Sequence, residues 1–131
     1  MKCILLINDM AGYGKVALSS MIPILSSMKF QVYNLPTALV SNTLDYGKFD
    51  ILETTEYMKN SMRIWDELGF KFDMISTGFL VSEEQTKLVS EYCQKKKEDG
   101  TLVREVTSDA TTGVFTIQDI KFNQAGTYTY K

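Results

Sequence analysis

Short apolar runs of strand length recur along residues 1–103 of the chain. Residues 3–7 (CILLI) form a continuous apolar run, which is typical of a strand that is buried on both faces. Strand character returns over 30–35 and over 72–77, and a further strand begins at 101–103. Each run is too short for a helix, so the pattern predicts a series of buried strands.

The segments between these strands have apolar residues at helical spacing. They predict helices over 15–28, 54–68 and 83–97. Gly69 is a natural end for the second helix, and Ser82 with Gln85 forms a capping box ahead of the third. Pro23 departs from the pattern, because a proline inside a helix removes a backbone hydrogen bond.

Alternation of strands and helices predicts a Rossmann-like α/β fold in which right-handed crossovers build a parallel sheet. Ligands of such sheets bind at the carboxyl ends of the strands. The loops expected at that edge are residues 8–14, 36–45 and 78–82.

The pattern changes after Val103, where helical spacing disappears. Residues 106–119 and 121–131 are rich in Thr, Val, Ile, Phe and Tyr and alternate with a period of two, which predicts antiparallel strands. Turns are expected at Thr112-Gly113 and Ala125-Gly126. The sequence therefore predicts two parts, a parallel-sheet half-domain over 1–103 and a short antiparallel β tail over 104–131.

Composition narrows the classes of function. Hydrophobic residues make up 44% of the chain, which is enough for a core, and the net charge of -2 argues against binding to nucleic acid or to an anionic membrane. No apolar stretch has the length of a membrane span or a signal peptide, so we expect a cytoplasmic protein. Cys3 and Cys93 are then expected as free thiols, and the absence of histidine disfavours His-based catalysis and most zinc sites.

Three strings at the expected ligand edge carry a family resemblance. They are INDMAGYG at 7–14, LPTALVSNT at 35–43 and STGFL at 76–80. In this order they resemble the N-terminal half of vitamin B6 kinases, the pyridoxal/pyridoxamine kinases of the ribokinase-like fold, and the match extends over residues 3–103. Hydroxymethylpyrimidine kinases are the most easily confused relatives.

The resemblance implies a substrate site for a B6 vitamer at Asp9, Thr37 and Phe79. The counterpart of Asp9 hydrogen-bonds the pyridine ring, and the counterpart of Thr37 approaches the ring from the second loop. Phe79 stands where relatives often have tyrosine, and Thr43 stands where they frequently have histidine. Each residue also has a plainer reading: Asp9 as the cap of the next helix, Thr37 as a turn residue and Phe79 as part of the core.

The same resemblance implies that the catalytic half is missing. In the family, ATP and Mg²⁺ are held by an acidic stretch after the fourth strand and by a Gly-rich loop with the catalytic Asp. Here residues 104–107 (REVT) follow the fourth strand, and nothing downstream resembles that loop. We therefore expect no catalytic residue, no metal ligand and no ATP site in this chain, which would be a truncated kinase that is inactive alone.

The tail carries a different resemblance. Residues 109–131, and the string AGTYTY at 125–130 above all, are similar to the closing strands of Gram-positive pilin-type β-sandwich domains; an ordinary β-hairpin is the alternative. A chimeric structural or interaction protein that works through this tail is thus the second functional hypothesis. Truncation at Val103 would expose a sheet edge, and we expect self-association through that edge unless the tail adds its strands to the sheet.

Overall fold

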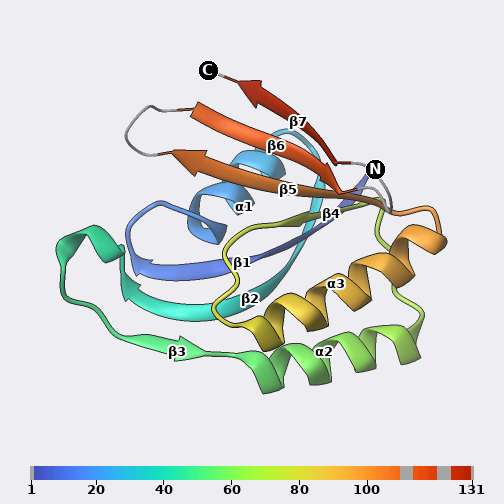
Figure 1. The fold of residues 1–131 in the computed structure, drawn as a ribbon, viewed down its shortest axis with the longest axis horizontal. Helices are drawn as coiled ribbons and strands as arrows, with labels where there is room; N and C mark the ends of the chain where they lie inside the picture. The colour runs from blue at the N-terminus through green and yellow to red at the C-terminus, as the bar shows by residue number, and fades with distance from the viewer. Residues whose placement is uncertain (1, 110–113, 121–124, 131) are drawn as a thin grey trace.

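The computed structural model describes residues 2–109, 114–120 and 125–130 (Figure 1). The described elements, in chain order, are β1 (Cys3–Tyr13), α1 (Leu18–Ser27), β2 (Gln31–Asn42), a 3₁₀ turn (Leu44–Tyr46), β3 (Ile51–Glu53), α2 (Thr55–Leu68), β4 (Met74–Thr77), α3 (Glu83–Glu98), β5 (Leu102–Asp109), β6 (Val114–Ile120) and β7 (Ala125–Tyr130). The helices predicted at 15–28, 54–68 and 83–97 are confirmed with small shifts at their ends.

The strands of the described residues form one seven-stranded sheet in the order β3-β2-β1-β4-β5-β6-β7. β2, β1, β4 and β5 run parallel to one another, as the alternating pattern predicts, whereas β3 pairs antiparallel with β2. The chain is thus an α/β protein whose sheet is parallel at its centre and continues into a short antiparallel β tail, as the sequence predicts.

Helices cover both faces of the parallel strands, and the apolar run of β1 supplies both interfaces. Leu5 and Ile7 belong to the core cluster under α2 and α3, whereas Ile4 and Leu6 belong to the cluster under α1 (Figure 1). All four side chains are almost completely buried. This burial on both faces explains why the strand is continuously apolar instead of alternating.

Strands β1 and β2 are longer than predicted. Residues 8–14 and 36–45 were expected to be loops, but β1 runs to Tyr13 and β2 runs to Asn42. Their parallel pairing continues past a register shift between Asn8 and Met10. The glycine of this segment, Gly12, permits close pairing, because a Cβ there would lie 3.0 Å from the carbonyl oxygen of Ser41. The prediction of loops at these positions is wrong, because glycine and polar residues, which usually mark loops, here lie within strands.

The described parts of the tail extend the sheet. β5 crosses the predicted boundary at 103/104 without a break, β6 pairs antiparallel with β5, and β7 pairs antiparallel with β6. The predicted turn at Ala125-Gly126 is wrong, because both residues lie in β7 and pair with Ile120 and Asp119. The turn expected at Thr112-Gly113 lies outside the described residues.

Of the two outcomes expected for the tail, addition of its strands to the sheet is therefore the one observed. The division into two domains and the resemblance to pilin-type domains stay predictions. Self-association through the edge of β5 was expected only if the tail strands did not join the sheet, and β6 pairs along that edge. The oligomeric state stays a prediction. Within the described part of the chain, no helix combines the length and apolar character needed to cross a membrane.

Candidate functional site

The three residues implied as a substrate site come from neighbouring strands of the sheet. Asp9 lies on β1, Thr37 lies on β2, and Phe79 follows β4. Because β1 stands between β2 and β4, and the register pairs Asn8 with Pro36 and Ile7 with Thr77, these residues lie at one level of the sheet. This level is the carboxyl end of β4, but it falls within the longer strands β1 and β2. Hydrogen bonds that pass through Asn8 and Thr37 connect them.

The side chain of Asn8 ties the segment at Asp9 to the loop after β4. Its Oδ1 atom accepts hydrogen bonds from the backbone N–H of Asp9 at 2.9 Å and from that of Phe79 at 3.0 Å. Gly78 leaves room for this side chain, since a Cβ at Gly78 would lie 2.7 Å from Asn8 Oδ1 and still closer to its Nδ2 and Cγ atoms. Sequence reasoning did not single out Asn8, although it lies inside the string that carried the resemblance.

Thr37 holds the same loop through the carbonyl group of Phe79. Its side chain is completely buried, and its hydroxyl donates a hydrogen bond of 2.9 Å to the carbonyl oxygen of Phe79. It lies within β2, not in a turn. The backbone N–H and C=O of Phe79 are therefore both fixed by side chains, while its ring remains 44% exposed and is not part of the core.

Asp9 is a half-buried carboxylate without a salt bridge among the described residues. Burial raises the pKa of Asp9 above its ordinary value, and a hydrogen bond from its own backbone N–H only partly opposes that rise. It does not cap the following helix, because Ala17 stands at the N-cap of α1 and makes no side-chain cap. A partly desolvated carboxylate beside the carboxyl end of the neighbouring parallel strand β4 is a candidate for contact with a ligand.

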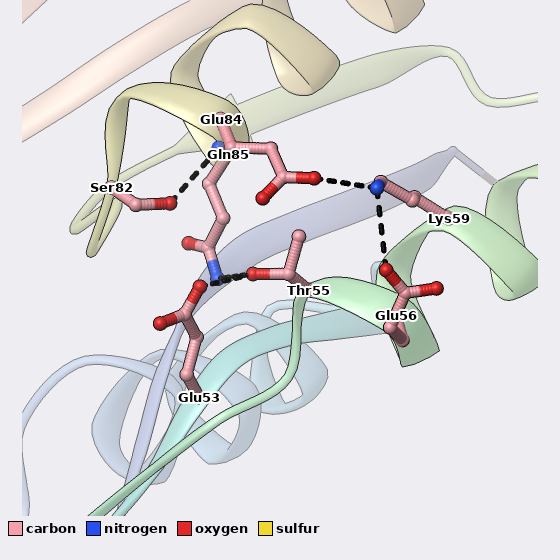
Figure 2. Close-up of polar contacts among 7 residues, drawn as sticks. All are labelled: Glu53, Thr55, Glu56, Lys59, Ser82, Glu84 and Gln85. Atoms are coloured by element: carbon pink, nitrogen blue, oxygen red, sulfur yellow. Dashed lines mark hydrogen bonds and ion pairs between the residues drawn. The ribbon is translucent and has the colours of Figure 1, made fainter.

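Gln85 at the start of α3 connects segments around this site, and Figure 2 shows its contacts with Ser82 and Thr55. Its side chain is completely buried, and its Nε2 donates to the carbonyl oxygen of Thr37 at 2.9 Å and to Thr55 Oγ1 at 3.2 Å. Its Oε1 accepts from the backbone N–H of Val81 at 3.1 Å. One side chain thus joins β2, the first turn of α2 and the loop that leads into α3.

The predicted capping box is confirmed in one half. Ser82 Oγ accepts a hydrogen bond of 3.1 Å from the backbone N–H of Gln85, as expected (Figure 2). The reciprocal bond does not go to Ser82, because the amide of Gln85 reaches Val81 and Thr37 instead. The box therefore orders the loop after β4 as well as the helix.

A charged link lies beside this buried one. Lys59 of α2 contacts Glu84 of α3 at 2.5 Å and Glu56 at 3.3 Å, and both carboxylates raise the pKa of Lys59 through hydrogen bonds (Figure 2). Because these side chains are largely exposed, we assign the link to helix orientation and not to substrate binding.

Solved structures similar to this chain belong to kinases of small ring compounds. A Bacteroides thetaiotaomicron protein described as a phosphomethylpyrimidine kinase, crystallised with pyridoxal, is 39% identical with a TM-score of 0.77, over 83% of this chain and 39% of that one. The pyridoxal kinase of Lactobacillus plantarum is 25% identical with a TM-score of 0.69, over 72% of this chain and 34% of that one. No family model and no curated protein matches the sequence.

The chain has a ribokinase-like fold. A third structure, the Leishmania donovani pyridoxal kinase with ADP and ginkgotoxin, matches 98% of this chain and 73% of that one with a TM-score of 0.70, and its identity of 11% supports the fold alone. The chain spans only 39% of the first of these proteins and 34% of the second. Activity and substrate are therefore proposals for this chain.

Replacing Gln85 with alanine should destabilise the fold, because the carbonyl of Thr37 and the N–H of Val81 lose buried hydrogen-bond partners. We expect the free energy of unfolding to fall by about 2–5 kcal/mol. Urea denaturation measures this change. Gln94→Ala, an exposed glutamine of the same helix, is the matched control and should change stability by less than about 0.5 kcal/mol. Equal stability of the two variants would contradict the role assigned to Gln85.

The Asp9→Asn variant should show the cost of burying this carboxylate. Since the folded-state pKa of Asp9 is raised above 3.8, protonation of Asp9 favours the fold at low pH, and that stability is lost as the pH rises through the folded-state pKa. Asp9→Asn should match the wild type below pH 3.8, then become the more stable protein as the pH rises, with a constant difference at neutral pH.

Thermal unfolding from pH 3 to pH 8 measures this difference. Asp45→Asn removes one negative charge from an exposed position and controls for the change in net charge. An Asp9→Asn variant that is less stable than the wild type at neutral pH would show that the Asp9 carboxylate is held by favourable contacts.

Proposed function

We propose that this chain binds the ring of a vitamin B6 compound at Asp9 and Phe79, as the substrate-binding half of a B6 kinase. The observation that carries the proposal is a set of three hydrogen bonds: Asn8 binds the backbone N–H groups of Asp9 and Phe79, and Thr37 binds the backbone carbonyl of Phe79. The likeness to a protein crystallised with pyridoxal supports it.

The proposed roles follow from burial. The half-exposed ring of Phe79 supplies an apolar surface on which a pyridine ring can stack. Asp9 supplies a partly desolvated carboxyl group that can hydrogen-bond the pyridine or its substituents more strongly than in water. Thr37 is a positioning residue, because its hydroxyl is used to hold the backbone of Phe79.

Phosphorylation requires more than these residues provide. Transfer of a phosphoryl group from ATP needs a proton acceptor at the substrate hydroxyl and positive charge or hydrogen-bond donors around the phosphates. Among the described residues, no group of three or more Asp, Glu, Cys or His side chains could hold a metal ion together. We assign ATP and Mg²⁺ to no residue of this chain and propose that it contributes binding and orientation of the ring.

Binding is best tested with pyridoxine, because it lacks the aldehyde of pyridoxal that reacts with lysine. Calorimetry should give saturable binding of one pyridoxine per chain. Asp9→Ala and Phe79→Ala should each weaken binding by about tenfold or more, as expected for loss of a charged hydrogen bond or a stacked ring. Tyr57→Ala, which removes an exposed aromatic ring of α2, should bind as the wild type does.

Two results would contradict this proposal. One is the absence of saturable pyridoxine binding by a folded chain. The other is binding that neither Asp9→Ala nor Phe79→Ala weakens. A hydroxymethylpyrimidine titrated in the same way tests the related substrate class, and tighter binding of the pyrimidine than of pyridoxine would move the proposal to that class.

The 131-residue chain should not phosphorylate pyridoxine with Mg-ATP, because we find no counterpart of the Gly-rich catalytic loop in its sequence. Chromatographic detection of pyridoxine phosphate measures turnover. The Asp9→Ala variant, purified in parallel, reveals contaminating host kinase as equal activity in both samples. Activity present in the wild type and lost in Asp9→Ala would show that the chain supplies the missing chemistry itself.

A further inference from the structure

A cavity lies near the amino ends of β1 and β2, away from Asp9. It has a volume of about 330 Å³ and is lined by residues near the amino ends of β1 and β2, by α2 and by the connection from α2 to β4. Its volume lies at the lower end of the range for small-molecule sites.

Aromatic side chains from three elements surround this cavity. The ring of Phe72 lies 6.0 Å from the ring of Tyr33 on β2 and 6.0 Å from the ring of Trp65 on α2, with interplanar angles of 65° in both pairs. Phe72 is buried, whereas Tyr33 is 39% exposed and Phe70, which also lines the cavity, is 47% exposed. Edge-to-face rings with exposed surface around a small cavity suit a flat aromatic guest.

The positive charge of Lys71 at the cavity wall favours an anionic aromatic ligand over a cationic one. Lys71 is an exposed lining residue without an ion pair to any other described residue. Neither neighbouring carboxylate pairs with Lys71: Asp66 binds Lys95 at 3.1 Å and Lys96 at 3.0 Å, and Asp73 accepts a hydrogen bond of 2.7 Å from the backbone N–H of Cys3. An aromatic cage without Lys71 would favour a cation, but this ammonium repels cations and attracts a carboxylate.

We propose that this cavity is a binding site for a planar aromatic carboxylate, with the ring among Tyr33, Trp65 and Phe72 and the carboxylate at Lys71. The site is separate from the one proposed for the B6 ring, since it lies near the amino ends of β1 and β2, away from Asp9. It does not depend on the proposed kinase function.

Trp65 offers a direct measurement, because it is the only tryptophan of the chain and gives one indole N–H signal in NMR spectra. Titration with 2-naphthoate should shift this signal saturably, with a Kd on the order of 1 mM or tighter. The cation 2-naphthylmethylamine should bind at least about fivefold more weakly. Saturating pyridoxine should leave the naphthoate titration unchanged.

Two variants test the roles of charge and ring. Lys71→Gln should weaken naphthoate binding by about fivefold and remove its preference over the amine, and Tyr33→Ala should weaken binding by about tenfold. Lys29→Gln, an exposed lysine outside the cavity lining, is the control and should behave as the wild type does. Absence of a saturable shift, equal binding of the amine by the wild type, or competition by pyridoxine would each overturn the proposal.

Discussion

The buried amide of Gln85 is the contact on which the arrangement around the candidate site depends. A glutamine side chain without any exposed surface must have its polar atoms paired, because an unpaired buried amide costs several kcal/mol. Here the partners come from β2, α2 and the loop before α3. A shift of one of these segments would break its bond to Gln85, so the three are held together. The position of the loop that carries Phe79 therefore depends on how the helices pack.

Much of the fold could be predicted because it follows from periodicity within the chain. The continuous apolar run at β1 and the helical spacing of α2 and α3 reflect burial against neighbours on known faces, so they indicated the parallel sheet and its helices. The three-residue β3 was not predicted, since so short a strand leaves no pattern. The extensions of β1 and β2 were misread because glycine and polar residues there usually mark loops.

The site was predictable only in part. Asp9, Thr37 and Phe79 came from the family resemblance, and the structure brings them together. The bonds between Asn8 and Phe79 and between Gln85 and Thr37 join residues far apart in the chain. The spacing of residues along the sequence cannot predict such pairs. Gln85 was noticed only as a capping residue, which is the smaller of its two roles.

The contact between Asn8 and Gly78 has a consequence for how related sequences can diverge. The side-chain amide of Asn8 fills the space in which the Cβ of a larger residue at position 78 would lie. A relative with a larger residue at position 78 must carry a smaller one at position 8, and it must then find another acceptor for the N–H of Phe79. Positions 8 and 78 should accordingly covary across an alignment, and lineages that keep asparagine at position 8 should keep glycine at position 78.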